Sequence, residues 1–331
     1  MLSLSAAADP LLQQVDQLIK DALTTSFPHL QEMVDHLLLA GGKKIRPLLV
    51  LLSGRVSGEQ RNPSQRRSLV SVAAAVELIH TASLVHDDII DRADRRRGQA
   101  TLHSRWGNRS ATLVGDFLLS RAFDLISDLE QNWNLLPLMS RSVMLLCRGE
   151  VLQLEKSYDY SISEQEYFRC NYLKTSQFLA ACCEAGGRIG AAAPAHIRAL
   201  REYGFNLGQA FQIVDDILDF KDDPEKLGKP VGADLDQGVM TLPLIYLARR
   251  QERFRLILEA LKTRRMSLSP GLRESIRRAV RESGALEYSA RRADQARRAA
   301  LQALQVLPQT PARTRLSHIA EAIMARAGEV F

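Results

Sequence analysis

Two acidic motifs in helical surroundings constrain this chain more than any other feature. The first is DDIID at residues 87–91, and the second is DDILD at residues 215–219. Upstream of each motif, apolar residues recur every three or four positions, which is the period of an amphipathic helix. On such a helix the first and last aspartates of a motif lie one turn apart on one face. The sequence therefore predicts two long helices, each with an acidic edge beside its apolar stripe.

Carboxylates one helical turn apart repel each other unless something neutralises them. Asp87 and Asp91 form one such pair, and Asp215 and Asp219 form the other. Mg²⁺ suits these pairs, because it takes one or two carboxylates and completes its shell with water and phosphate oxygens. Mn²⁺ is the alternative ion. A single motif of this kind is more often a solvated helix face, but two copies with Arg or Lys nearby favour a metal site.

The composition favours an all-α protein with no nucleic-acid partner. Of the 331 residues, 46% are hydrophobic and only 6% are aromatic. Much of the net charge of +6 comes from arginine pairs in the C-terminal third, and the acidic residues between them indicate solvated helix faces. No apolar run approaches the roughly 20 residues that span a bilayer, and no signal peptide is recognisable. The four cysteines fit neither a zinc site nor a disulfide framework, so we expect a cytoplasmic protein.

The pattern of helical segments predicts one all-α domain, residues 1–331, built as a single large bundle of long helices around a central cavity. The expected helices span residues 10–25, 28–40, 64–91, 110–130, 134–158, 163–184 and 196–221, with one more from Thr241 and several within 252–329. Residues 92–108 are expected to form a charged loop, Gly186-Gly187 to break the chain, and no strand is predicted. Lys43 and Arg46 follow a Gly-Gly helix stop and would make an anion site.

With these features the sequence resembles the trans-isoprenyl diphosphate synthases, of the polyprenyl type that includes octaprenyl, solanesyl and decaprenyl diphosphate synthases. The resemblance runs from about Gly41 to Leu244. It rests on GGKKIRP, the two acidic motifs, the RRG after the first, a Lys-Thr pair, the Phe-Gln before the second, and the GKPVGADL…GxxTLP loop. One position departs from the family pattern, because Val239 stands where a lysine is common.

The resemblance implies a role for each matching residue. Four match the positions that hold isopentenyl diphosphate: Lys43, Arg46, His80 and Arg97. Four match those that bind Mg²⁺ on an allylic prenyl diphosphate: Asp87, Asp91, Asp215 and Asp219. Five match its other contacts, the first two of them acting in catalysis: Arg96, Lys174, Thr175, Gln212 and Lys229.

The resemblance also implies the reaction, a Mg²⁺-dependent head-to-tail condensation of isopentenyl diphosphate onto the allylic substrate. The metals and nearby cations would stabilise the departing diphosphate. Short-chain members of the family carry bulky aromatic residues one turn before the first acidic motif. Here that turn holds the small Ala82 and Ser83, and the expected stop is Ile79 one turn deeper or a side chain from a neighbouring helix. The product should therefore exceed geranylgeranyl length.

Several alternatives remain open at this stage. A non-catalytic or partner-dependent subunit of a heteromeric synthase would share the fold, although both acidic motifs are kept here. A shorter-chain, geranylgeranyl synthase would use the same machinery. A terpene cyclase or head-to-head enzyme would share the acidic helices but would not need the second diphosphate site. The family implies a homodimer, with the helices of 110–158 as its expected interface, and a product that associates with membrane.

Overall fold

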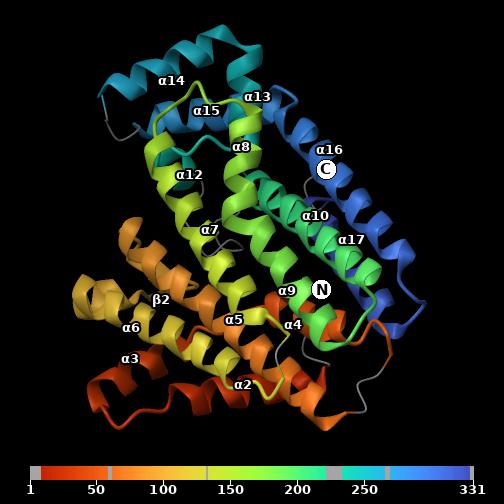
Figure 1. Cartoon of the computed structure of the whole chain (residues 1–331). Helices are drawn as coiled ribbons and strands as arrows, with labels where there is room; N and C mark the ends of the chain where they lie inside the picture. The colour runs from red at the N-terminus through yellow and green to blue at the C-terminus, as the bar shows by residue number, and fades with distance from the viewer. Residues whose placement is uncertain (1–8, 59–61, 132, 221–232, 265–268, 329–331) are drawn as a thin grey trace. The chain divides into compact units, whose positions relative to one another are not determined.

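The computed structural model describes residues 9–58, 62–131, 133–220, 233–264 and 269–328. This part of the chain is almost entirely helical, which confirms the all-α prediction (Figure 1). The chain divides into two compact units that each draw on separate segments. Unit 1 comprises Met1–Val143, Leu179–Gly204 and Ala303–Ile319. Unit 2 comprises Met144–Phe178, Phe205–Gln302 and Ala320–Phe331.

Unit 1 is organised around its longest helix. The elements in its first segment are α2 (Pro10–Leu23), α3 (Pro28–Leu39), α4 (Ile45–Gly54), α5 (Pro63–Ile90), the strands β1 (Arg95–Arg96) and β2 (Gln99–Ala100), and α6 (Leu102–Ser127). Helices α2, α4 and α6 all pack against α5. The start of α5 is set locally, because the Asn62 side chain accepts a hydrogen bond from the Ser64 amide and Pro63 occupies the first helical turn.

Helix α5 is long and apolar enough to cross a membrane by length and composition alone, and no other helix of the described residues is. Its most apolar stretch is 72% buried within the protein, which is what a core helix also shows. Residues 73–75 are three consecutive alanines with no exposed surface, so neighbouring helices approach α5 closely there. The apolar length of α5 is therefore explained by its central place in unit 1.

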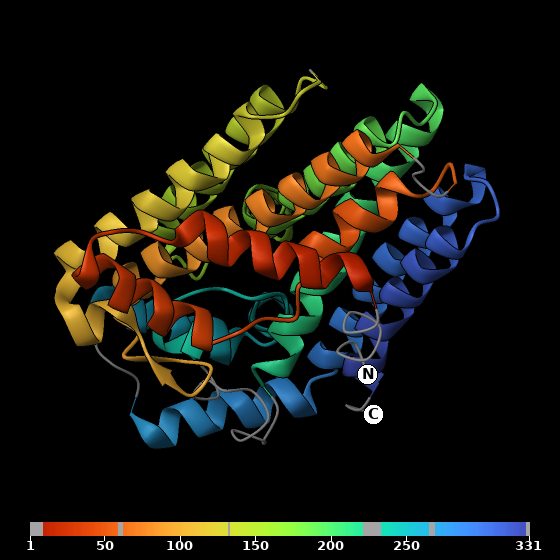
Figure 2. The same cartoon turned by 90° about the horizontal axis from the view of Figure 1, so that it is seen from below.

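The expectation of a loop without strands over residues 92–108 is wrong. Strands β1 and β2 pair antiparallel, with Arg95 opposite Ala100 and Arg96 opposite Gln99. The two residues between them, Arg97 and Gly98, both have positive φ, of 51° and 80°, as a tight two-residue hairpin turn requires. The strands are only two residues long, so they carry no alternating pattern. Figure 2 shows this hairpin beside the C-terminal end of α3, where His36 hydrogen-bonds the Ala100 carbonyl.

Unit 2 is also helical throughout its described residues. Its own elements are α8 (Glu164–Asn171), the π-helix η1 (Tyr172–Ser176), α12 (Ala233–Asp236), α13 (Leu242–Arg250), α14 (Glu252–Arg264) and α15 (Pro270–Glu282). The 3₁₀ turn η2 (Leu304–Val306) belongs to unit 1. Five of the described helices contribute residues to both units: α7 (Leu135–Lys156), α9 (Gln177–Ile189), α10 (Pro194–Leu218), α16 (Ala285–Ala303) and α17 (Pro311–Gly328).

The predicted chain break at Gly186-Gly187 is also wrong, because both glycines lie inside α9. A Cβ atom on Gly186 would stand 2.2 Å from the Val50 carbonyl oxygen of α4, and one on Gly187 would stand 2.8 Å from a Leu200 methyl group of α10. The absence of side chains lets α9 approach these neighbours within unit 1. Glycine serves here for close packing and not as a helix stop.

Buried charges tie distant parts of unit 1 together. The Asp9 carboxylate caps α2 by accepting a hydrogen bond from the Leu11 amide, and it pairs with Arg55 at 2.5 Å and Arg315 at 2.7 Å. Its side chain has no exposed surface.

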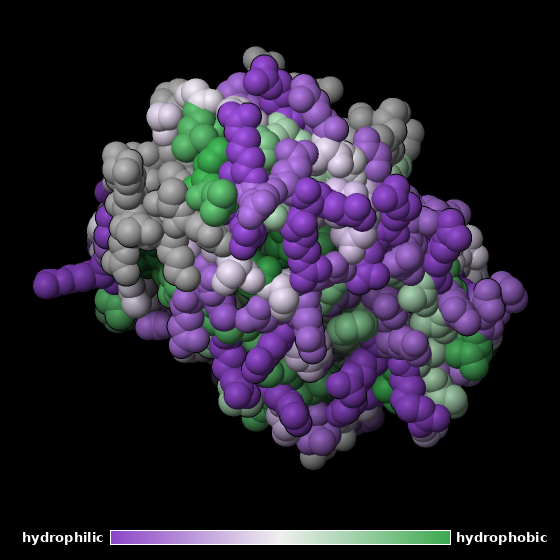
Figure 3. Space-filling view, turned by 90° about the horizontal axis from the view of Figure 1, so that it is seen from above, coloured by the Kyte–Doolittle hydropathy of each residue, from purple (hydrophilic) through white to green (hydrophobic). Residues whose placement is uncertain are grey.

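The face drawn in Figure 3 is largely hydrophilic, and the hydrophobic residues visible on it form small separate groups. All four cysteines are free thiols, as expected.

Candidate active site

The first acidic motif lies at the C-terminal end of α5, where Asp91 is the capping residue. Asp87 and Asp91 are partly exposed, whereas the middle residue Asp88 is buried and accepts a hydrogen bond from Arg96 Nε at 2.6 Å. The last turn of α5 has no basic residue. Because the C-terminal end of a helix is itself partially negative, it would stabilise a cation bound at the two outer carboxylates.

The second acidic motif repeats this arrangement in unit 2. Helix α10 ends at Leu218, so the motif again lies at a helix C-terminus without a basic residue in the last turn. Its middle residue Asp216 is 3% exposed and accepts hydrogen bonds from Tyr167 at 2.6 Å and Gln212 at 3.0 Å. Burial and the charge of Asp234 raise the pKa of Asp216 to about 8. Asp215 and Asp219 remain partly exposed.

Each motif thus offers two accessible carboxylates on one helix face and keeps its third carboxylate for internal contacts. Among the described residues, no group of three or more His, Cys, Asp and Glu side chains is placed to hold a metal ion. A cation at either pair would therefore need further oxygen ligands from water or phosphate, which is how Mg²⁺ is usually bound. The donor sets fit Mg²⁺, and the assignment of these four aspartates as its ligands remains a prediction.

The residues predicted to hold isopentenyl diphosphate lie around the start of α4 in unit 1. Arg97 donates a hydrogen bond to the Gly41 carbonyl, so the hairpin turn closes over the Gly-Gly segment that precedes Lys43. Burial, followed by the charges of Arg46, Arg97 and Arg96, holds the pKa of His80 well below its usual value. His80 is therefore neutral at pH 7, beside arginines whose charges would attract an anion.

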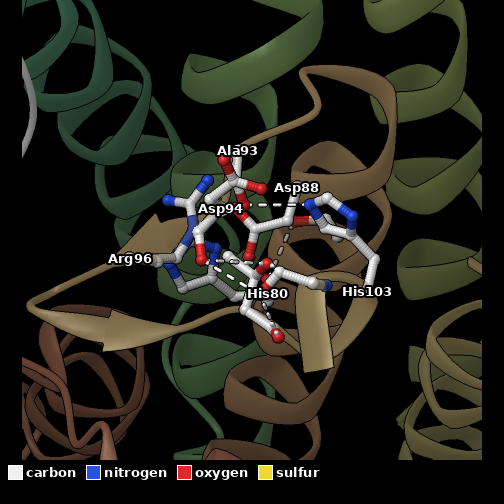
Figure 4. A network of polar contacts seen from close by, with 9 residues as sticks. His80, Asp88, Ala93, Asp94, Arg96 and His103 are labelled. Atoms are coloured by element: carbon white, nitrogen blue, oxygen red, sulfur yellow. Dashed lines mark hydrogen bonds and ion pairs between the residues drawn. The ribbon is translucent and has the colours of Figure 1, made fainter. Parts of the chain in front are cut away.

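Figure 4 shows how the hairpin is joined to the acidic end of α5. The Arg96 side chain points to Asp88, and His103 hydrogen-bonds the Ala93 carbonyl at 2.9 Å. A cavity of about 90 Å³ lies on this side of α5. Its polar wall includes His80, Arg96 and Arg97 together with Lys44, Glu77 and Asp88, and its apolar wall is mainly leucine from α2, α3, α5 and α6. The cations therefore border a hollow with both polar and apolar walls.

The predicted contacts of unit 2 lie on and around the π-helix η1. Lys174 Nζ lies 2.6 Å from a Glu150 carboxylate oxygen and donates to Gln153 at 2.9 Å. Thr175 donates to Gln212 at 2.9 Å, and Gln212 in turn donates to Asp216. The structure therefore connects this Lys-Thr pair to the second acidic motif. π-helical turns are frequent at functional sites, since the extra residue redirects side chains.

Three further predicted positions concern product length. Ile79 and Ala82 are each 2% exposed and pack in the interior of unit 1, while Ser83 is partly exposed. Ser83 donates a hydrogen bond to the His80 carbonyl at 2.8 Å. None of the three lines the cavity described above. Their role in product length therefore stays a prediction.

Two positions complete the comparison with the sequence. Lys229 lies outside the described residues. Val239 is half-buried, and its amide donates to the Asp234 carbonyl at 2.8 Å. Its side chain brings no charge to the loop where the family commonly places a lysine.

Sequence reasoning missed the residues that orient the predicted ones. They are the buried middle aspartates Asp88 and Asp216, the hydrogen-bond donor Tyr167, and the lysine partners Glu150 and Gln153. The middle aspartates were visible in the motifs themselves, at the position between the two face-sharing carboxylates. The others carry no local signal, because their partners are distant in the sequence.

Comparisons with known proteins agree with this picture. The sequence model of the family "Polyprenyl synthetase" matches residues 27–275. Octaprenyl diphosphate synthase of Escherichia coli (strain K12) is 36% identical over 314 residues, which cover 94% of each protein. Heptaprenyl diphosphate synthase component 2 of Bacillus subtilis (strain 168) is 34% identical and covers 94% of this chain and 87% of its own length.

A solved structure supports the same assignment. The polyprenyl synthase of Caulobacter crescentus CB15, crystallised with calcium and isoprenyl diphosphate, superimposes with a TM-score of 0.90 at 35% identity. The match covers 97% of this chain and 96% of the other. The helical fold, the two acidic motifs and these likenesses place the chain in the polyprenyl synthetase family, and it is therefore a prenyltransferase.

Proposed function

We propose that the protein is a trans-polyprenyl diphosphate synthase that condenses isopentenyl diphosphate head to tail with an allylic prenyl diphosphate. The observation that carries this proposal is the cluster of Arg46 and Arg97 beside a buried, neutral His80 in unit 1. An allylic substrate held through metals at the acidic pairs would not require this cluster. A second diphosphate, bound by cations, accounts for it and argues against a cyclase, which uses only one diphosphate.

At the allylic site, the protein binds the diphosphate and stabilises its negative charge as it leaves. Asp87 and Asp91 with Asp215 and Asp219 would hold Mg²⁺, which when bound supplies positive charge against the departing diphosphate. Lys174, oriented by Glu150 and Gln153, adds a fixed cation for the same charge. Thr175 and Gln212 would orient the diphosphate oxygens, since they are already joined to each other.

At the isopentenyl site, the protein orients the nucleophile, which is the double bond of isopentenyl diphosphate. Lys43, Arg46 and Arg97 would bind its diphosphate by charge, while neutral His80 would contribute a hydrogen bond without charge. As the allylic carbon–oxygen bond breaks, the isopentenyl double bond forms the new carbon–carbon bond. The resulting cation then loses a proton to the departed diphosphate and regenerates an allylic diphosphate, longer by one unit.

The product is proposed to exceed geranylgeranyl length, because the turn before the first acidic motif carries only Ala82 and Ser83. The octaprenyl synthase among the relatives supports this length. The test is to incubate the purified chain alone with farnesyl diphosphate, isopentenyl diphosphate and Mg²⁺, and to size the dephosphorylated prenols. A geranylgeranyl product would select the shorter-chain alternative. Turnover only after a second protein is added would select the partner-dependent one.

The metal assignment has its own test. Asp87→Asn and Asp215→Asn should each lower kcat by about 10³-fold or more, because each removes a carboxylate that would hold the Mg²⁺ whose charge offsets that of the leaving group. EDTA should abolish wild-type turnover and Mg²⁺ or Mn²⁺ should restore it. Asp94→Asn, an exposed aspartate near the first pair, is the matched control and should keep its activity. Full activity of either motif variant would remove the metal site from this proposal.

We further propose that the protein acts in the cytoplasm as a homodimer and delivers its product to a membrane surface. The support is exposed apolar side chains on two helices. Leu113 of α6 is 68% exposed in unit 1, and Met144, Val151 and Leu154 of α7 are 51–54% exposed in unit 2. Burying such faces against a second copy would remove them from water. Sedimentation of wild type against Leu154→Glu tests this, because the charge should shift the protein to monomer.

A further inference from the structure

A buried carboxylate lies behind the loop that leads into α4, and no role has been assigned to it. Glu77 stands in the most apolar part of α5, where its neighbours on both sides are buried alanine, valine and leucine. The residue is 8% exposed. Burying a carboxylate among such residues is unfavourable unless a cation compensates it. Glu77 pairs with Lys44, whose Nζ lies 3.7 Å from Glu77 Oε1.

Lys44 itself has an unusual backbone. Its φ of 52° and ψ of 33° place it in the left-handed region, which glycine, asparagine and aspartate enter far more readily than lysine. It is also the residue that caps α4, because its carbonyl accepts the hydrogen bond from the Leu48 amide. The conformation of Lys44 therefore sets the direction in which α4 leaves the loop.

Two carboxylates hold the Lys44 side chain. Asp16 of α2 lies 3.1 Å from its Nζ, and Glu77 of α5 approaches from the other helix. Glu77 also packs under the loop, since a Cβ atom on Gly42 would stand 3.3 Å from Glu77 Oε1 and 3.1 Å from Arg97 Nη1. The loop is thus enclosed between the α5 carboxylate and the hairpin arginine, all within unit 1.

This arrangement places the Lys44 charge toward two acids, while its chain neighbours Lys43 and Arg46 are the residues proposed to bind isopentenyl diphosphate. We propose that Glu77 is a positioning residue for that site: with Asp16 it holds Lys44 in its left-handed conformation, and so fixes where Lys43 and Arg46 present their charges. The inference rests on the proposed function. It assigns the ion pairs a role in substrate geometry and not only in stability.

The main test is the Michaelis constant for each substrate in Glu77→Gln, which keeps the shape of the side chain and removes its charge. The KM for isopentenyl diphosphate should rise about tenfold, while kcat and the KM for the allylic substrate stay within about twofold. If Lys44 instead bound the diphosphate directly, freeing it from Glu77 would tighten binding. A lowered KM for isopentenyl diphosphate, or an unchanged one, would therefore overturn the proposal.

Substitutions at Lys44 separate conformation from charge. Lys44→Met loses both ion pairs and should show the same rise as Glu77→Gln, whereas Lys44→Arg keeps them and should stay near wild type. Lys44→Gly has no cation either, but glycine adopts a φ near 50° without strain. It should therefore recover much of the affinity lost in Lys44→Met. A glycine variant as impaired as the methionine variant would show that backbone conformation is not what Glu77 controls.

Controls distinguish positioning from general stability and from failure of the proposed function. Glu184 is a buried carboxylate of the same unit, 7% exposed and paired with Arg188 at 2.5 Å. Glu184→Gln should lower the unfolding temperature without changing the KM for isopentenyl diphosphate. If Glu77→Gln behaved like this control, or raised both Michaelis constants equally, Glu77 would be a packing residue only. Wild-type chain that makes no product would reject the proposed function itself, before any variant is compared.

Discussion

Arg97 occupies a backbone position that arginine seldom takes. Its φ of 51° is the first of two positive values in the hairpin turn, a place where asparagine and glycine are preferred. Such strain costs on the order of 1 kcal/mol and persists where the surrounding structure or the function requires the side chain. Here the side chain reaches the Gly41 carbonyl beside the proposed isopentenyl site. The strain thus marks the same residue that the sequence pattern marked.

Arg97→Asn should therefore lower the affinity for isopentenyl diphosphate without lowering stability. Asparagine relieves the turn, so the unfolding temperature should stay level or rise, while the KM for isopentenyl diphosphate should rise about tenfold or more through the lost charge. Arg92 is a matched control, because it is exposed and has a φ of 52° without a predicted binding role. Arg92→Asn should likewise keep or raise the unfolding temperature, but it should leave the KM for isopentenyl diphosphate unchanged. Thermal unfolding and steady-state kinetics on both variants decide the matter.

At the scale of single helices, α9 depends on having no side chain at one position. Gly186→Ala would place a methyl group against the Val50 carbonyl oxygen of α4, and backbone cannot move aside as a flexible side chain would. We expect a loss of about 1–3 kcal/mol in the free energy of unfolding. Gly271 in α15 has nothing within 4 Å of its would-be Cβ. Gly271→Ala should be neutral or slightly stabilising in the same denaturant titration, and equal losses at both sites would contradict the packing argument.

Helix α5 is where product length should be set. Ser83→Phe adds a ring one turn before Asp87, on the helix face that carries the first acidic pair. The first condensation should survive because the carboxylates are untouched, and the product should shorten to farnesyl or geranylgeranyl length. Ser83→Thr is the control, since it adds little volume and should leave the length unchanged. Chromatography of the dephosphorylated prenols measures this, and a long product from Ser83→Phe would mean that the chain grows along another route.

The elements differ in how far the sequence predicted them. Helix α5 was predicted to within about one residue at each end, because Asn62-Pro63 starts it and its apolar period is regular. The hairpin was missed, since strands of two residues have no period to detect. The π-turn at Lys174 was likewise invisible, as it depends on glycines of other helices, where a Cβ on Gly149 would stand 2.7 Å from Lys174 Cγ. Local sequence signals therefore predicted the long helices, whereas the hairpin and the π-turn depend on packing between residues that are distant in the sequence.

The site shows the same division. Asp87 and Asp215 were recognisable because their spacing is a property of the motif alone. Glu77 and Glu150 were not, because a buried acid in an apolar helix has meaning only once its partner is known. The residues that touch a substrate follow short patterns, whereas the residues that orient them are recruited from wherever the fold brings a side chain.

At the scale of the whole molecule, the Asp9 carboxylate joins parts of unit 1 that are far apart in the sequence. Burial alone would raise the pKa of Asp9, but hydrogen bonds and charge from Arg55, with the Leu11 amide and Arg315, bring it below its usual value. An acid with a lowered folded pKa stabilises the protein above its unfolded pKa near 3.8, and that stability is lost as the pH falls through the folded value.

Asp9→Asn should therefore cost about 3–5 kcal/mol of unfolding free energy at pH 7, because two arginines lose a buried partner. The difference from wild type should shrink as the pH is lowered below about 4. Asp35→Asn, at an exposed position on α3, is the control and should change stability by less than about 0.5 kcal/mol. Urea titrations of the three proteins at several pH values measure this. A difference that does not depend on pH would mean that shape, not charge, makes Asp9 important.

The segmented composition of unit 1 has a consequence for how the protein is made in the cell. Asp9 and Arg55 belong to its first segment, but Arg315 belongs to its last, which begins at Ala303. A ribosome adds about 5–20 residues per second, so roughly ten to fifty seconds separate the emergence of the two arginines. During that interval α2, α4 and α6 can already pack against α5, but the Asp9 carboxylate can pair only with Arg55 and not yet with Arg315. Unit 1 can thus begin to fold early in translation, but it can complete its fold only when almost all of the protein has been synthesised.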